Sequence, residues 1–96
     1  MPTLDEEFEA EVRAAVALSR QFNCYPPRFE EVMQRSGAVE AARQFVASKK
    51  VHPGLKTLAE HHYLHLSIES IMLKEHYEAL FSPSVLEVAE WRLLQV

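Results

Sequence analysis

The first part of the chain repeats apolar and small residues at intervals of three and four positions. These positions are Leu4, Phe8, Val12, Ala15, Ser19 and Phe22. The spacing is that of one face of an α-helix. Thr3 and Glu6 have the spacing of a capping box at the helix start, and the prolines at 26 and 27 prevent the helix from continuing. We therefore predict a long amphipathic helix over residues 1–23.

Two short helical patterns lie on either side of Gly37. Pro27, which suits the first position of a helix, is followed by apolar residues at 29, 32 and 33, and the second pattern has apolar residues at 39, 42, 45 and 46. A glycine in this place is typical of a helix end. The pattern predicts two helices joined at an angle, followed by a loop over residues 48–54.

The remaining sequence predicts three more helices. A helix of two to three turns is expected over residues 55–62, followed by a brief extended or turn stretch over 64–66. Ser67 is placed to cap the next helix, whose apolar stripe runs to Phe81. Ser82–Pro83 supplies a cap and a first helical position for the last helix.

These patterns predict an all-α protein, a compact bundle of about six helices in which the first is long and the others are short to medium. We expect one domain over residues 1–96, made of the helix at 1–23 and a multi-helix body at 25–96. Apolar residues make up 48% of the chain and charged residues 25%, which are ordinary globular values. Two glycines are few for a protein built on β-hairpins.

The net charge and the cysteine content indicate which partners and which cellular compartment to expect. The formal net charge of -4 argues against general binding to a phosphate backbone, which depends on Lys and Arg. Cys24 is a lone thiol, which fits a reducing compartment. The chain has no apolar run of the ~20 residues that span a bilayer, and its first residues are acidic where a signal peptide is basic. We expect a cytoplasmic protein without a membrane partner.

Candidate chemistry is sparse. His61 and His65 would share a face in a continuous helix and could ligate one metal ion, although no third ligand stands at a recognisable offset. No nucleophile motif or phosphate-binding glycine loop is present, and Cys24 is interpreted as a small buried residue. We therefore expect no enzyme, no cofactor and no metal, with the two histidines as the open alternative.

Two surfaces are candidates for binding a partner. The fifth and sixth predicted helices carry more apolar residues than one stripe needs, and a basic segment has no acid between Glu40 and Glu60. The candidate partner-binding residues are Leu73, Tyr77, Trp91 and Leu94 on the apolar surface and Arg43, Lys49, Lys50 and Lys56, with His52, in the basic segment.

From Tyr25 to about Leu93, the chain resembles a small helical domain of unknown function found in uncharacterised bacterial proteins. The motifs that carry the resemblance are Tyr25-x-Pro27-x-Phe29-x-x-x-Met33, Gly37-Ala38-Val39-Glu40-Ala41-Ala42, Gly54-Leu55-x-x-Leu58, Leu64-His65-Leu66-Ser67-Ile68-Glu69 and Leu80-Phe81. That domain typically has Asp where His65 stands and Thr-Val where Ser67-Ile68 stands. The resemblance implies a helical fold and a bacterial source, and it carries over no functional residue.

The sequence favours a non-enzymatic protein–protein interaction module, such as an adaptor, a regulatory subunit or an inhibitor. It would act through the apolar face of its last helices or through the basic segment. A nucleic-acid-associated domain, with a helix-turn-helix around Gly37, is the second hypothesis. Against it, Glu40 and small alanines stand where a recognition helix carries Arg, Asn or Gln. A homodimer formed through the last helix is the third.

Overall fold

The structure is a computed structural model that describes residues 2–22, 25, 27–47 and 53–96. Within these ranges the chain forms six α-helices and three short 3₁₀ helices, and no strand. The α-helices are α1 (Leu4–Ser19), α2 (Pro27–Ser36), α3 (Ala38–Val46), α4 (Pro53–Glu60), α5 (Ile68–Met72) and α6 (Pro83–Leu94). The 3₁₀ helices are η1 (Arg20–Phe22), η2 (Leu64–Leu66) and η3 (Glu75–Leu80). The predicted all-α bundle with a long first helix is confirmed.

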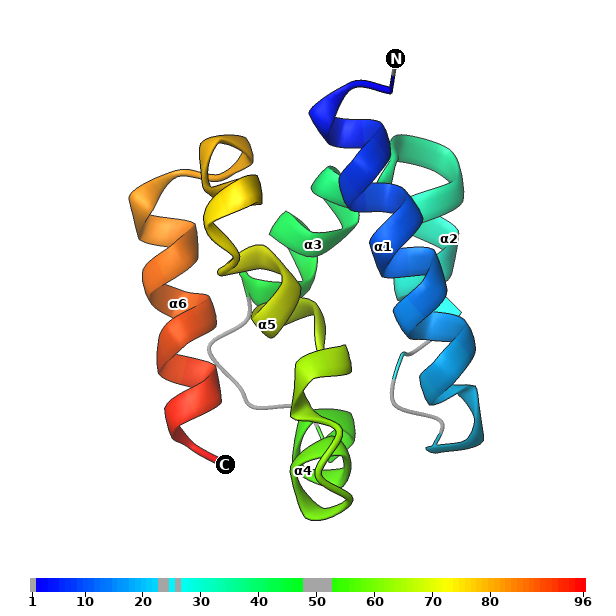
Figure 1. The fold of residues 1–96 in the computed structure, drawn as a ribbon, viewed down its shortest axis with the longest axis vertical. Helices are drawn as coiled ribbons and strands as arrows, with labels where there is room; N and C mark the ends of the chain where they lie inside the picture. Colours follow the sequence, from blue (N-terminus) through cyan, green and yellow to red (C-terminus); the bar gives the residue numbers. More distant parts are fainter. Residues whose placement is uncertain (1, 23–24, 26, 48–52) are drawn as a thin grey trace.

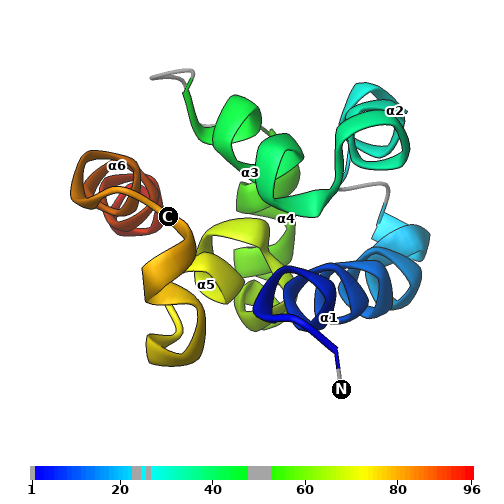
Figure 2. The ribbon, with the colours of Figure 1, turned by 90° about the horizontal axis from the view of Figure 1, so that it is seen from above.

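Short α5 lies in the middle of the bundle, with the other helices around it (Figures 1 and 2). Helix α1 packs on α3 and α5, α2 packs on α3, and α6 packs on α5 and α3. In both views α6 and α2 lie on opposite sides of the molecule. Helix α6 therefore has one side against the body and the other side directed outward.

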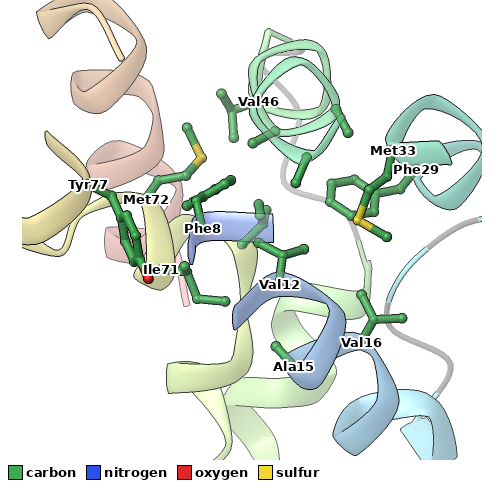
Figure 3. Close-up of a cluster of buried hydrophobic side chains, with 14 of the residues drawn as sticks. Phe8, Val12, Ala15, Val16, Phe29, Met33, Val46, Ile71, Met72 and Tyr77 are labelled. Atoms are coloured by element: carbon green, nitrogen blue, oxygen red, sulfur yellow. The ribbon is translucent and has the colours of Figure 1, made fainter. Parts of the chain in front are cut away.

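The core is built around the predicted apolar face of α1. Phe8 and Val12 are fully buried, and Phe8 lies beside Tyr77 (Figure 3). The ring of Phe8 meets the rings of Tyr77 and Phe81 edge-on at centroid distances of 5.2 Å and 5.3 Å. The capping box is also confirmed, because the Thr3 hydroxyl accepts a hydrogen bond from the Glu6 amide at 3.2 Å while the Glu6 side chain reaches back to Thr3. The capping box determines where α1 begins, and the apolar face determines which side of the helix is buried.

Gly37 ends α2 and begins α3 as predicted. Its φ is +90° and its ψ is 163°, a conformation essentially restricted to glycine. The residue has no side chain with which to cap α3. The carboxylate of Glu9 on α1 caps the helix instead, because it accepts a hydrogen bond from the Ala38 amide at 3.0 Å. The sharp corner between α2 and α3 is therefore held against α1.

Several predicted boundaries are wrong. The α-helix expected over residues 1–23 ends at Ser19 and continues as η1, and the helix expected over residues 55–62 ends at Glu60. The loop expected over residues 48–54 does not extend to Gly54, because Pro53 already occupies the first position of α4; residues 48–52 lie outside the described part of the chain. The helix expected to run to Phe81 stops at Met72. Lys74 is extended, with φ −65° and ψ 135°, and the chain resumes as the 3₁₀ helix η3.

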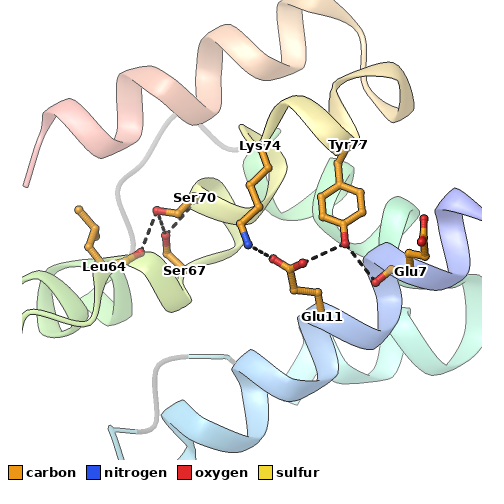
Figure 4. Close-up of polar contacts among 7 residues, drawn as sticks. All are labelled: Glu7, Glu11, Leu64, Ser67, Ser70, Lys74 and Tyr77. Atoms are coloured by element: carbon orange, nitrogen blue, oxygen red, sulfur yellow. Dashed lines mark hydrogen bonds and ion pairs between the residues drawn. The ribbon is translucent and has the colours of Figure 1, made fainter.

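The break at Lys74 is caused by tertiary contacts. It turns Tyr77 and Phe81 toward Phe8, and it brings the Tyr77 hydroxyl to the Glu11 carboxylate on α1 (Figure 4). These contacts override the local preference for one continuous helix. At the other end of α5 the cap is as predicted, since the Ser67 hydroxyl accepts the Ser70 amide at 3.1 Å (Figure 4).

Candidate protein-binding surface

Helix α6 is attached to the body by a charged residue in its buried face. Arg92 is 1% exposed, and its Nε lies 3.3 Å from a carboxylate oxygen of Glu69 on α5, which is fully buried. The guanidinium also donates to the backbone oxygen of Phe45 on α3 at 2.8 Å, and it lies 5.2 Å from the centre of the Phe45 ring. One side chain therefore connects three helices.

Burial and pairing act in opposite directions on these two groups. Burial raises the pKa of Glu69, and the charge of Arg92 counteracts part of that rise. Burial lowers the pKa of Arg92, and the charge of Glu69 counteracts it. Each charge thus offsets part of the desolvation cost of the other.

The pair also decides what remains on the outward side of α6. Arg92 is the one Lys or Arg in the sequence of this helix, and its guanidinium is buried. The outward side exposes Trp91, with 45% of its surface accessible, and Leu94, with 75%. Both of these predicted partner-binding residues are therefore available at the surface.

The other two apolar candidates are not available in this way. Tyr77 was expected on a partner surface, but it is only 4% exposed and forms part of the core. Leu73 is half-buried and packs against the same core. The prediction is wrong for Tyr77 because the break at Lys74 turns η3 inward, which the helical pattern did not indicate.

Tyr77 belongs instead to a polar contact between α1 and η3 (Figure 4). Its hydroxyl donates to Glu11 at 2.9 Å, and Lys74 pairs with the other oxygen of that carboxylate. Burial, the hydrogen bond to Glu11 and the negative charges of Glu11 and Glu7 raise the pKa of Tyr77 to about 12. For Glu11, burial favours a higher pKa, but the hydrogen bonds from Lys74 and Tyr77 and the charges of Lys74 and His76 lower it below its usual value.

A groove of about 610 Å³ runs between η3 and α6. Phe81, which is buried, and Leu86, which is half-buried, are the least exposed of its lining residues. The lining residues are Glu75, Glu78, Ala79, Phe81, Pro83, Leu86, Glu87 and Glu90. Four of these are glutamates, and among the described residues neither Lys nor Arg lines the groove.

The acidic groove was missed in the sequence, although a signal was present. Residues 75–91 contain four glutamates and neither Lys nor Arg. The cations that flank this stretch are engaged elsewhere, Lys74 with Glu11 and Arg92 with Glu69. The signal was overlooked because only the folded chain places η3 beside α6.

The predicted basic surface is only partly described. Arg43 is exposed on α3 and forms an ion pair with Glu40 at 2.9 Å, and Lys56 is exposed on α4. Lys49, Lys50 and His52 lie outside the described residues. The two basic residues whose positions are known thus stand on different helices, and one of them already has an acidic partner.

His61 and His65 do not share one helix. Helix α4 ends at Glu60, His62 has a positive φ of 65°, and His65 belongs to η2. His61 stacks on Phe22 at a centroid distance of 4.7 Å. In the ranges that the structure describes, no three His, Cys, Asp or Glu residues are grouped so that they could hold a metal ion. Cys24 lies outside these ranges.

A smaller cleft of about 180 Å³ lies between α2 and α3. Buried Phe29 and Val32 form one wall, Ala41 and Phe45 form the other, and Arg28 and Gln44 complete the lining. Of the two helices that line this cleft, α2 lies on the opposite side of the molecule from α6 (Figures 1 and 2).

Comparisons with protein-family models, with curated proteins and with solved structures found no match. The resemblance to a bacterial helical domain therefore stays a prediction. None of the described helices is both long enough and apolar enough to span a lipid bilayer.

Proposed function

We propose that this protein is a non-enzymatic protein–protein interaction module whose partner binds the outward side of α6. The observation that carries the proposal is the exposure of Trp91 and Leu94 together on that helix. Aromatic residues such as Trp supply much of the binding energy at protein interfaces. Burying apolar area stabilises a complex by roughly 25 cal/mol per Å² before the costs of association are subtracted.

The attachment of α6 supports the same proposal. Ser82 caps the helix by accepting the Val85 amide, and Arg92 connects it to Glu69 and to the Phe45 carbonyl. A helix held at its start and in its last turn presents Trp91 and Leu94 in a fixed arrangement. A partner then loses less free energy to ordering this surface.

The alternatives have less support. A helix-turn-helix at Gly37 would use α3 for recognition, but Glu40 on its outer face already bonds to both Arg43 and Gln44. Self-association through Trp91 and Leu94 would use the same surface as a different partner protein would. Adaptor, regulatory subunit and inhibitor are all roles of this class of module.

Photo-crosslinking tests the proposal directly. A photoreactive amino acid in place of Leu94 should give one defined adduct in cells that express the protein. Mass spectrometry of the adduct would distinguish a different partner from a second copy. The same group in place of Gln34, exposed on α2 at the far side, is the matched control and should give none.

Variants then test which side chains are needed. Trp91→Ala and Leu94→Asp should each abolish the contact while circular dichroism shows unchanged helicity. An equal adduct from position 34, or no adduct from position 94, would contradict the proposal. Loss of helicity in both variants would assign these residues to the core instead.

A further inference from the structure

We propose that the groove between η3 and α6 binds a basic amphipathic segment of a partner protein, with Lys or Arg residues beside an apolar stripe. This inference rests on the proposed interaction function and specifies the chemistry of the partner. It is carried by three properties of the groove, namely its unbalanced negative charge, its apolar lining and its continuity with Trp91 and Leu94.

The negative charge is not balanced within the described part of the chain. Glu75 and Glu78 stand on η3, and Glu87 and Glu90 stand on α6 across the groove. None of the four has an ion pair among the described residues, whereas Glu9, Glu11 and Glu69 do. Four like charges around one groove repel each other, and a cationic partner relieves that repulsion.

The apolar lining of the groove favours a ligand that has apolar groups as well as positive charge. Phe81 and Leu86 are its least exposed lining residues, and Ala79 and Pro83 add apolar surface to the lining. An apolar side chain of the partner would cover this lining while its basic residues face the glutamates. The described acids are not grouped tightly enough for a metal ion, so a bound divalent cation does not account for the site.

The groove continues into the exposed end of α6. Pro83, Glu87, Glu90 and Leu94 are spaced four, three and four residues apart, so they form one stripe along the helix. Trp91 follows Glu87 by four positions and lies beside this stripe. The face is therefore acidic in its second turn, at Glu87 and Glu90, and apolar in its last turn.

The length of this face sets the size of the partner segment. Helix α6 has 12 residues, which is about 18 Å at 1.5 Å per residue. A partner helix of similar length would place lysines opposite the glutamates and a large apolar residue opposite Trp91 and Leu94. Such amphipathic helices commonly dock into grooves through anchors at i, i+3, i+4 and i+7.

Trp91 provides the reporter for the test. It is the one tryptophan of the chain and lies at the edge of the proposed site. The probe is a synthetic helical peptide that carries a lysine stripe beside a leucine stripe. Titration should change the emission of Trp91, and the anisotropy of a labelled copy of the peptide should give the same affinity. A peptide with glutamate in place of each lysine should not bind.

Charge-neutralising variants locate the site. Glu87→Gln combined with Glu90→Gln should weaken binding on the order of fivefold, since each exposed ion pair contributes modestly. Glu31→Gln, on α2 at the opposite side, is the matched control and should leave affinity unchanged. Added salt should weaken binding to the unmodified protein more than binding to the double variant.

The possible outcomes are separable from those of the crosslinking experiment. Lysine-peptide binding that is unaffected by Glu87→Gln and Glu90→Gln overturns the assignment to this groove. Equal binding of the glutamate peptide, or binding of neither peptide, overturns the basic partner. If position 94 still crosslinks in that case, the interaction function stands and only the partner's chemistry is wrong.

Discussion

The guanidinium of Arg92 lies 3.3 Å from the carboxylate of Glu69 in the interior of the bundle. This contact connects the last helix to the central one, and it withdraws the cation of α6 from the surface. The outward side of α6 keeps Glu87, Glu90, Trp91 and Leu94. The internal ion pair and the proposed binding surface are thus two sides of the same helix.

Removing one member of the buried pair should destabilise the protein strongly. Arg92→Met leaves the Glu69 carboxyl buried without its cation and removes the bond to the Phe45 carbonyl. We expect a loss of about 3–5 kcal/mol in the free energy of unfolding. Urea denaturation followed by circular dichroism measures it.

The loss should depend on pH in a defined direction. The pKa of Glu69 is raised, so folding favours its protonated form, and stability falls as pH rises through that pKa. Arg92→Met should therefore cost more near neutral pH than in mild acid. The double variant Glu69→Leu, Arg92→Met should cost less than the sum of the single changes. Strictly additive losses would show that the two side chains do not interact.

Leu94→Ala should leave stability almost unchanged. Leu94 is exposed, so we expect an effect within about 0.5 kcal/mol. Leu58→Ala is the matched control, because the same atoms are removed from a fully buried position and about 2–5 kcal/mol should be lost. Thermal unfolding of both variants measures the difference. A large loss from Leu94→Ala would mean that this side chain is part of the core.

Tyr77→Phe should cost about 1 kcal/mol by removing the hydrogen bond to Glu11. The pKa of Tyr77 is raised to about 12 from the ordinary tyrosine value of 10.0. The hydroxyl therefore stabilises the fold fully below pH 10.0, and this stabilisation is lost as the pH rises toward about 12. Alkaline unfolding curves should therefore be less steep in Tyr77→Phe. Tyr77 titrating at the ordinary value in the folded protein would contradict the contact.

Gly37→Ala should destabilise the protein through its backbone. At φ +90° an added Cβ would meet only the Glu9 carboxylate at 3.8 Å, which is ordinary contact, so the cost is conformational. We expect about 1–3 kcal/mol. Gly54→Ala, in the first turn of α4, should be neutral or slightly stabilising. Similar effects of both changes on the melting temperature would argue against the positive φ at Gly37.

Local signals were sufficient to predict most of the helices. Thr3, Gly37, Ser67 and Ser82 each mark a helix boundary through an interaction with a nearby backbone group or through a special φ. The break at Lys74 was not predictable in this way. It depends on contacts of η3 with Phe8 and Glu11, which are more than sixty residues away in sequence.

The proposed site was predictable only in part. Trp91 and Leu94 were predicted at the surface because α6 has more apolar residues than its buried side needs. The buried pair was missed, since neither Glu69 nor Arg92 signals its partner in the sequence. Glu69 precedes the apolar Met72 by three residues and Arg92 follows Ala89 by three, a spacing that was a signal that each lies on an apolar face. The groove was missed because its lining residues come from both η3 and α6, whose relative position depends on the fold.

Mapping the bound lysine–leucine peptide by NMR tests the central claim most directly. Backbone amide shifts of the isotopically labelled protein report the contact residue by residue. We expect the changes to gather in η3 and α6, with the Trp91 indole among the largest, and α2 to be unaffected. Changes concentrated in α2 and α3, or no changes at a saturating peptide concentration, would contradict the assignment of the binding surface to α6.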